Sequence, residues 1–193
     1  MFFSDPADVA IIGGGLAGLA AALDLAGRGH RVVLIERKQY PFHKVCGEYV
    51  SHEVGPYLRR LGADPAPLGP ADIKRFQLSS PAGRVLDSPL DLGGFGVSRY
   101  QLDNFLYRLA VARGVQVVLP ATVTDVAFDA AADGHVLTLA DGRQLAARLV
   151  LGTYGKRSAL DRQLGRAFFG QRSPYLGVKH HLRLPGFPRD LIA

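Results

Sequence analysis

Three glycines in the spacing Gly-x-Gly-x-x-Gly, at residues 13–18, stand between two short apolar runs near the start of the chain. The run before them, residues 9–12, has the length and composition of a buried parallel strand. Apolar residues recur at helical spacing over residues 16–28, and a run rich in β-branched residues follows at 31–36. This order of strand, turn, helix and strand predicts a βαβ unit and therefore a parallel sheet.

Each position of the glycine motif has a physical role in binding a dinucleotide. Gly13 permits the tight turn, Gly15 lets the backbone approach a pyrophosphate, and Gly18 lets the helix pack closely against the strand. The predicted helix begins at Leu16 and Ala17, where free N–H groups and the positive end of the helix dipole face the phosphates.

The second predicted strand ends on an acidic residue, Glu36, about 20 residues after the motif. A carboxylate at this position accepts a hydrogen bond from a ribose 2′-hydroxyl, whereas it repels a 2′-phosphate. The site is therefore predicted to take an adenine dinucleotide other than NADP. These residues alone leave both FAD and NAD open as the ligand.

The composition is that of an ordinary folded protein and argues against several function classes. Of the 193 residues, 48% are hydrophobic and 21% are charged, which suits one compact domain, with or without part of a second. The net charge of +6 fits an anionic ligand that carries phosphates. Nucleic-acid binding is not expected, because zinc-finger spacing, a helix-turn-helix signal and a basic stripe interleaved with aromatics are all missing from the sequence.

The cysteine count and the apolar segments bear on location. Cys46 is the single cysteine, so no internal disulfide forms, and we expect a cytoplasmic setting. Residues 1–6 lack the basic region of a signal peptide. The apolar stretch at residues 9–26 contains three consecutive glycines and Asp24, so we expect no transmembrane segment there.

The rest of the chain alternates between helical and strand-like patterns, separated by glycine, proline and Asp-Gly signals. The expected elements are a helix at 51–61, a connector at 64–70, short strands at 73–97 with turns at 81–83 and 93–94, a helix at 100–113, strands at 115–128 and 135–151 with a hairpin turn at 141–142, a loop and short helix at 152–166, and a strand at 175–184.

Four segments resemble one family in their order along the chain. Residues 8–37 resemble the N-terminal FAD-binding segment of the flavoprotein monooxygenases, whose relatives include the flavin halogenases and the geranylgeranyl reductases. Residues 99–106 are similar to the Arg-x-x-Leu/Phe-Asp-x-x-Leu helix start of the geranylgeranyl-reductase branch. Residues 41–48 resemble its Lys-x-Cys-Gly segment, and residues 149–158 occupy the place of the family's Gly-Ala-Asp-Gly-x-x-Ser signature. The resemblance implies that the dinucleotide is FAD.

The resemblance also implies an architecture. It is an α/β fold with a Rossmann-like FAD/NAD(P)-binding domain in three ββα layers and an interleaved β-rich substrate region. The expected domain limits are 1–170 for the FAD-binding domain, with a β segment inserted at about 71–98, and 171–193 for the start of an incomplete substrate-domain sheet. The residues that the motif and the resemblance together assign to cofactor binding are Gly13, Gly15, Leu16, Ala17, Gly18, Glu36, Arg37, Cys46, Gly47, Arg99 and Gly155.

Two departures from the family pattern limit these expectations. Tyr154 stands where the family has an aspartate tied to pyrophosphate and pyridine-nucleotide handling, which weakens the argument for NAD(P)H as electron donor. The family's later Gly-Asp segment is not found within the 193 residues. We therefore expect an N-terminal portion of a longer enzyme, a truncated product, or half of a split protein with a complementing C-terminal chain.

Several polar residues have both a functional and a plain structural interpretation. Cys46 is the one candidate catalytic residue, as a redox or substrate-side group, and packing beside Gly47 explains it equally well. Glu48 either faces the flavin region or caps the next helix. His180 and His181 lie on opposite faces of a predicted strand and cannot share a metal, so no metal site is expected.

Three functions remain open at this stage. The first is an FAD-dependent oxidoreductase, either a monooxygenase or similar to a geranylgeranyl reductase, that acts on a small organic substrate with NAD(P)H as electron donor. The second is a non-catalytic or partner-dependent dinucleotide-binding fragment. The third, an NAD-dependent dehydrogenase, requires a catalytic Tyr/Lys or His/Asp pair in register, and the sequence shows none.

Overall fold

The computed structural model describes residues 6–156, 158–171 and 174–193. They form two compact units. The first unit extends to Phe42 and resumes over Asp103–Tyr175, and the second comprises His43–Leu102 with Leu176–Ala193. The domain limits expected at residues 170 and 171 follow the resemblance rather than these contacts, and they stay a prediction.

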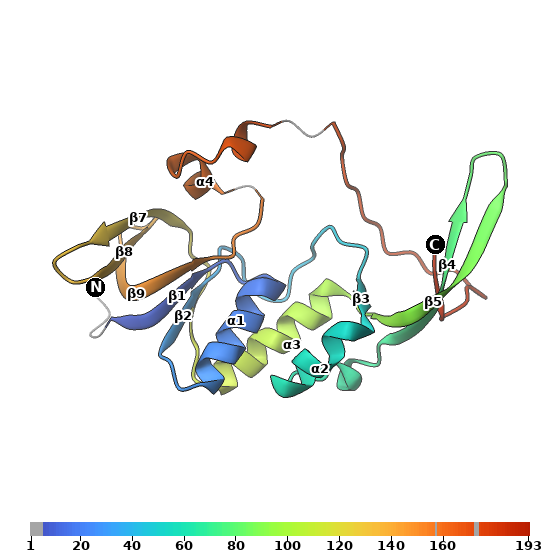
Figure 1. Cartoon of the computed structure of the whole chain (residues 1–193), viewed down its shortest axis with the longest axis horizontal. Coiled ribbons are helices and arrows are strands. Elements are labelled where there is room, and N and C mark those ends of the chain that lie inside the picture. Colours follow the sequence, from blue (N-terminus) through green and yellow to red (C-terminus); the bar gives the residue numbers. More distant parts are fainter. Residues whose placement is uncertain (1–5, 157, 172–173) are drawn as a thin grey trace. The chain divides into compact units, whose positions relative to one another are not determined.

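The first unit is built on one six-stranded sheet with the strand order β6-β2-β1-β9-β8-β7 (Figure 1). The four strands β6, β2, β1 and β9 are parallel, as the βαβ pattern predicts, and β8 and β7 continue the sheet in antiparallel fashion. The bounds are β1 (Ala7–Ile12), β2 (Val32–Ile35), β6 (Gln116–Val118), β7 (Val123–Asp129), β8 (Gly134–Leu139) and β9 (Gln144–Gly152). The expected hairpin at residues 141–142 is confirmed between β8 and β9.

The longest helices of the described chain are α1 (Leu16–Gly27) and α3 (Arg99–Ala112), and α1 and most of α3 belong to the first unit (Figure 1). The helix α1 contacts β1 and β2, and it buries Leu19 and Leu23 completely. It ends where the sequence predicts, because Gly29 adopts a left-handed φ of 85° that closes the last turn. A short helix, α4 (Ala159–Gln163), and a 3-10 turn, η3 (Ala167–Gly170), follow β9.

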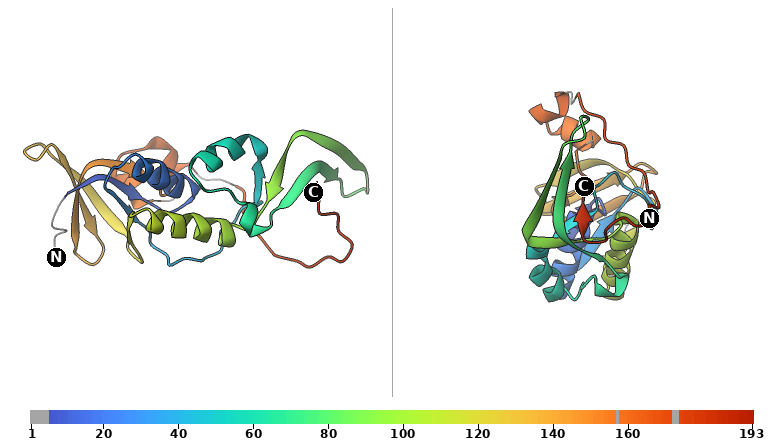
Figure 2. Two further views of the ribbon diagram at one scale, coloured as in Figure 1. Left: turned by 90° about the horizontal axis from the view of Figure 1, so that it is seen from below. Right: turned by 90° about the vertical axis from the view of Figure 1, so that its right-hand side faces the viewer.

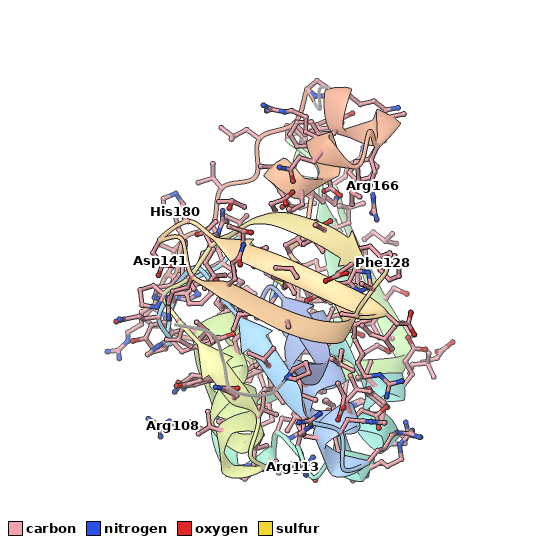
Figure 3. All side chains as sticks on the ribbon, turned by 90° about the vertical axis from the view of Figure 1, so that its left-hand side faces the viewer. Arg108, Arg113, Phe128, Asp141, Arg166 and His180 are labelled. Atoms are coloured by element: carbon pink, nitrogen blue, oxygen red, sulfur yellow. The ribbon has the colours of Figure 1, made fainter. Side chains whose placement is uncertain are left out.

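The hairpin strands β8 and β7 extend the sheet beyond β9, and β7 is the edge strand (Figure 3). The sequence predicts continuous strand over residues 115–128, but the structure divides this segment between β6 and β7 at opposite edges of the sheet. Pro120 lies in the break and has no N–H to donate to a ladder.

The second unit contains a four-stranded sheet with the order β10-β4-β5-β3 (Figure 2). Its long hairpin of β4 and β5 turns at residues 81–83, as expected. The expected helix at 51–61 is present as a 3-10 turn followed by an α-helix. The bounds are β3 (Tyr49–Ser51), η1 (His52–Val54), α2 (Gly55–Arg60), η2 (Ala66–Leu68), β4 (Ala71–Ser79), β5 (Val85–Gly96) and β10 (Leu191–Ile192).

Two expectations for this unit are wrong. The turn expected at residues 93–94 lies inside β5, where Gly93 takes a φ of 58° opposite a register shift between Ile73 and Arg75. This is the distortion of a β-bulge rather than a turn. The strand expected at 175–184 is absent, because that alternating segment has no ladder partner in the part of the chain that the structure describes.

Within the described ranges no helix is both long and apolar enough to cross a membrane. The apolar stretch at residues 9–26 divides between β1 and α1, as the glycines indicate. The described part of the chain contains no group of three or more His, Cys, Asp or Glu side chains that is arranged to hold a metal ion.

Candidate dinucleotide-binding site

The glycine motif forms the loop between β1 and α1, at the carboxyl end of the parallel strands. Gly13 has a φ of 103°, and its N–H donates a hydrogen bond of 2.8 Å to the carbonyl of Ile35 on β2. A Cβ atom at Gly13 would lie 2.6 Å from the Cα of Tyr154. A side chain is therefore excluded here by both the backbone conformation and the space, and the tight turn predicted for Gly13 is confirmed.

Gly18 brings α1 against the loop. A Cβ atom at this position would lie 2.0 Å from the carbonyl oxygen of Gly13 and 2.7 Å from Oγ1 of Thr153. The close packing predicted for Gly18 is thus confirmed. Gly15 precedes α1 in an extended conformation, and its carbonyl accepts the first helical hydrogen bond from Leu19 at 2.9 Å. The N–H groups of the first turn of α1 therefore have no helical acceptor, as an anion site requires.

Glu36 lies beside this loop and is almost completely buried, with 7% of its surface exposed. Its Oε2 accepts a hydrogen bond of 2.7 Å from the N–H of Gly14, and its Oε1 accepts one of 3.0 Å from the N–H of Lys38. A carboxylate has about four acceptor positions, so these two bonds leave capacity for a ribose hydroxyl. The acid at the end of β2 is thus held at the glycine loop.

Two side chains that the sequence analysis did not single out also fix the loop. The hydroxyl of Tyr40 donates to the carbonyl of Gly14 at 2.5 Å, and its ring stacks on Tyr107 with centroids 4.5 Å apart. The hydroxyl of Thr153 lies 2.8 Å from the carbonyl oxygen of Gly13 and 3.0 Å from that of Ile12. Thr153 was detectable in principle, since it directly follows a parallel strand, where α/β sheets place ligand contacts.

The eleven predicted cofactor residues fall into two groups. The first unit contains the eight at positions 13, 15, 16, 17, 18, 36, 37 and 155. Among them, Arg37 is exposed, and Gly155 follows β9 with a φ of 80° and open space around it. Cys46, Gly47 and Arg99 belong to the second unit.

Tyr154, which replaces the family's aspartate, has a structural role in the first unit. Its hydroxyl donates to Oδ1 of the buried Asp161 at 3.2 Å, and Nε of Arg166 lies 3.6 Å from the same oxygen. Burial and the neighbouring Asp161 carboxylate raise the pKa of the Tyr154 hydroxyl. Tyr154 thus ties the end of β9 to α4 as a neutral hydrogen-bond donor.

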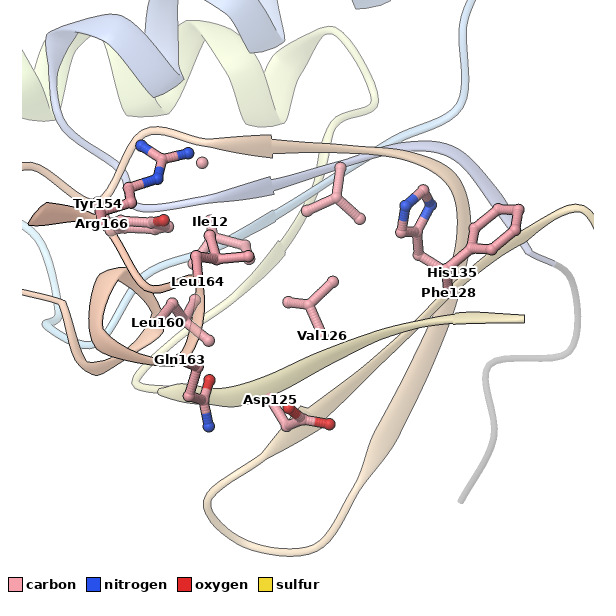
Figure 4. Close-up of a pocket in the computed structure, with 12 residues that line it drawn as sticks. Ile12, Asp125, Val126, Phe128, His135, Tyr154, Leu160, Gln163, Leu164 and Arg166 are labelled. Carbon is pink, nitrogen blue, oxygen red and sulfur yellow. The ribbon is translucent and has the colours of Figure 1, made fainter. Parts of the chain in front are cut away.

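A pocket of about 460 Å³ lies between α4 and the strands β7–β9 (Figure 4). Its wall is largely apolar, with Val126, Val150 and Leu160, and Tyr154 also lines it. Its size lies within the range of small-molecule sites.

In the second unit, Glu48 gathers three donors. Its Oε1 accepts hydrogen bonds of 2.6 Å from Nζ of Lys179 and 2.7 Å from the N–H of Arg99, and its Oε2 lies 3.0 Å from Nε2 of His181. Partial burial raises the pKa of the Glu48 carboxyl, but the bonds from Lys179, Arg99 and His181 together lower it by more. The pKa therefore lies below its ordinary value. Glu48 thus accepts from the first N–H of α3, whereas the sequence analysis expected it to cap the helix that follows it at 51–61, where the structure shows no side-chain cap.

Comparison with known proteins bears on the ligand of the glycine loop. Residues 8–44 match the family model described as FAD dependent oxidoreductase. The match covers nearly all of β1, then α1, β2 and the start of the following loop, and it includes Gly14 and Lys38, whose N–H groups donate to the Glu36 carboxylate.

The similarity to known proteins extends over nearly the whole chain. The chain is 30% identical over 186 residues to a menaquinone reductase of Mycobacterium tuberculosis (strain ATCC 25618 / H37Rv), covering 94% of this chain and 46% of that protein. It is also 30% identical over 164 residues to the FAD-dependent monooxygenase atnJ of Arthrinium sp, covering 80% and 37%. The chain thus spans less than half the length of these curated relatives.

Solved structures agree on the architecture. The flavin-dependent halogenase CmlS superposes with a TM-score of 0.72 at 26% identity, over 84% of this chain and 32% of that chain. The halogenase PltM gives a TM-score of 0.70 at 22% identity, over 83% and 36%. The expected Rossmann-like flavoenzyme fold and the resemblance to monooxygenases, geranylgeranyl reductases and flavin halogenases are confirmed.

Proposed function

We propose that the chain binds FAD through the glycine loop and is the cofactor-binding part of an oxidoreductase. The observation that carries this proposal is the preformed contact between Glu36 and Gly14. In this contact a carboxylate lies beside the N-terminal end of α1, which supports a ribose and a pyrophosphate as its ligands. Gly13 and Gly18 let the loop pack tightly against Tyr154, Thr153 and the start of α1, where a Cβ atom would clash, so the turn keeps the shape that the motif predicts. The residues present therefore fit the ADP half of FAD.

FAD supplies the redox chemistry when it is bound, with NAD(P)H as the electron donor. The side chains of this chain bind and orient the cofactor. Glu36 accepts from the ribose, the first turn of α1 donates to the phosphates, and Thr153 and Tyr40 keep the loop in shape. Arg37, Gly155, Cys46, Gly47 and Arg99 remain proposed contacts, and Cys46 remains the one proposed substrate-side group.

The substrate is proposed to be a small organic molecule with an apolar ring that carries oxygen. Support comes from the names of several relatives, among them menaquinone reductase, ubiquinone hydroxylase UbiM and a 2-heptyl-3-hydroxy-4(1H)-quinolone synthase. A cytoplasmic location is proposed from the single cysteine.

A second candidate is a dinucleotide-binding fragment that requires a complementing chain for activity. It is favoured by one observation, that the chain spans only 46% of the length of the menaquinone reductase that it resembles. In this case the ADP half of FAD would bind here, and the partner chain would supply further contacts to the flavin.

Titration of the purified chain with FAD, ADP and NADH separates these proposals. Tight binding of FAD with visible flavin absorbance, and weaker binding of NADH, is expected for the first. Equal affinity for FAD and ADP, with the flavin ring remaining solvent-exposed by its fluorescence, supports the fragment. A colourless chain that binds neither FAD nor ADP would overturn both, and tight binding of NADH alone would point to a dehydrogenase.

A further inference from the structure

The segment 176–184, here called the strap, runs extended and has no ladder partner among the described residues (Figure 2). Its side chains alternate in direction, as they do in any extended chain. Lys179 and His181 turn towards Glu48, whereas Val178 before them and Leu182 after them are 66% and 77% exposed. The polar side of the strap therefore holds it to the rest of the second unit.

The strap contacts residues 43–48, here called the Cys46 loop, at three places. A Cβ atom at Gly177 would lie 3.3 Å from Cγ1 of Val45, so the Val45 side chain lies against the strap backbone. Lys179 and His181 both reach the Glu48 carboxylate. The ring of His181 also meets that of His43 edge-on at 5.4 Å.

Glu48 is an unusual residue for its position. Its φ is 61°, in the left-handed region that glycine prefers and that other residues rarely adopt. Its N–H donates to Sγ of Cys46 at 3.4 Å, and its carbonyl accepts from Val97 at 3.1 Å. With its carboxylate on Arg99, Lys179 and His181, this one residue joins the Cys46 loop, the start of α3 and the strap.

The ion pairs at Glu48 are sheltered from water, which distinguishes them from ordinary surface pairs. The exposed fraction is 16% for the Glu48 side chain and 17% for that of Lys179. Charged hydrogen bonds of this kind are shorter and stronger than neutral ones, and the 2.6 Å separation agrees with that. His181 is half-exposed and adds to the attraction when it is protonated.

We propose that Glu48 is a latch that holds the strap against the Cys46 loop, and that its release frees this loop and so exposes the partly buried Cys46 thiol, to which the Glu48 N–H donates. In the closed state, Lys179 and His181 are bound to the carboxylate and Gly177 lies against Val45. In the open state, these contacts are lost together, because the strap has no ladder of its own to hold it. The proposal does not depend on FAD binding.

The test uses the full chain at a fixed pH of about 7. Because the thiolate fraction depends on nearby charges, labelling is interpreted together with a second measurement on the strap. The chain contains one cysteine, so the rate of labelling by a maleimide reports on Cys46 alone. Hydrogen exchange of residues 176–184, measured by mass spectrometry on the same samples, reports on the strap. The variants are Glu48→Gln, Glu48→Gly and Lys179→Met, with Glu53→Gln as the matched control on η1 of the same unit.

Glu48→Gln keeps the shape and removes the charge, and we expect about tenfold faster labelling together with faster exchange in the strap. Glu48→Gly relieves the backbone and removes the carboxylate, so it should open the latch as well. Lys179→Met should give a smaller increase in both, and Glu53→Gln should behave as the wild type.

Wild-type labelling and exchange in Glu48→Gln and Glu48→Gly would overturn the latch. Faster labelling with unchanged exchange would also overturn it, because the thiol would then respond to a local change. Should Glu48→Gln fail to fold, Glu48→Gly and Lys179→Met decide between the same outcomes.

Discussion

The backbone N–H of Gly14 donates a hydrogen bond of 2.7 Å to Oε2 of Glu36, which lies 22 residues further along the chain. This bond closes the glycine loop onto the end of β2, so the proposed ribose acceptor and the proposed phosphate donors have a fixed separation without any ligand. A site that is already ordered avoids part of the entropic cost of binding. The same bond satisfies a buried backbone donor, which links ligand binding to the stability of the fold.

Replacing Glu36 by alanine should therefore weaken both properties. The N–H groups of Gly14 and Lys38 would lose their acceptor, and the free energy of unfolding should fall by about 1–3 kcal/mol. Loss of the ribose contact should weaken FAD binding at least about tenfold. Urea denaturation and FAD titration measure the two effects, and Glu53→Ala on the exposed η1 is the control. Unchanged FAD affinity in Glu36→Ala would contradict the assigned role of Glu36.

Gly18→Ala should be the most destabilising small substitution in α1. The new methyl group would lie 2.0 Å from the Gly13 carbonyl oxygen, so the helix must move away from the loop. We expect a loss of about 2–4 kcal/mol in the free energy of unfolding. Gly27→Ala in the same helix meets no atom within 4 Å and should be neutral or stabilising by up to about 1 kcal/mol. Equal denaturation midpoints for the two variants would show that the close approach at Gly18 is not required.

Thr153→Val tests the contact between β9 and the glycine loop. Valine keeps the branched shape but cannot donate to the carbonyl oxygens of Ile12 and Gly13. The free energy of unfolding should fall by about 1 kcal/mol, and FAD should bind several-fold more weakly because the loop is less fixed. Thr153→Ser retains the hydroxyl and should bind FAD as the wild type does. If Thr153→Val and Thr153→Ser have the same FAD affinity, the hydroxyl does not order the loop.

Acid should release the Glu48 latch. Because the pKa of the folded Glu48 carboxyl is lowered, its contribution to stability is complete above the ordinary value of 4.5 and is lost as pH falls through the lower folded value. The groups that face it are Lys179, His181 and the N–H of Arg99. Carboxyl ¹³C NMR of the labelled chain, assigned with Glu48→Gln, should place the Glu48 titration below the ordinary value of 4.5. A midpoint at or above 4.5 would argue against the sheltered ion pairs.

Gly47→Ala distinguishes an effect on cofactor binding from an effect on the stability of the fold. Gly47 has no heavy atom within 4 Å of a Cβ position, and it is exposed within its unit. Alanine should therefore leave the denaturation curve within about 0.5 kcal/mol of the wild type. If Gly47 approaches the cofactor closely, as proposed, the same change should weaken FAD binding alone. Unaltered FAD affinity would remove Gly47 from the proposed contacts.

The elements that the sequence predicted well are those whose pattern is local. The βαβ unit follows from apolar periodicity and from a glycine motif in which positions 13 and 18 tolerate no Cβ atom. The hairpin at residues 141–142 follows from its Asp-Gly turn. The prediction of a strand at 175–184 was wrong for the opposite reason. Alternating apolar and polar residues show that a segment can pair in a sheet, but they do not supply the neighbouring strand. Likewise, the glycine pair at 93–94 predicts a turn, but in the structure Gly93 takes its positive φ at a β-bulge inside β5.

The sequence by itself determined the glycine loop, the acid at its side and hence the class of ligand, because conformational limits on glycine and charge at a strand end act over a few residues. Only the tertiary structure decided what holds that loop and what Glu48 does. Tyr40, Thr153, Lys179 and His181 act across 26 to 141 residues of chain. Such contacts depend on which strands and segments become neighbours, and no local pattern records that choice.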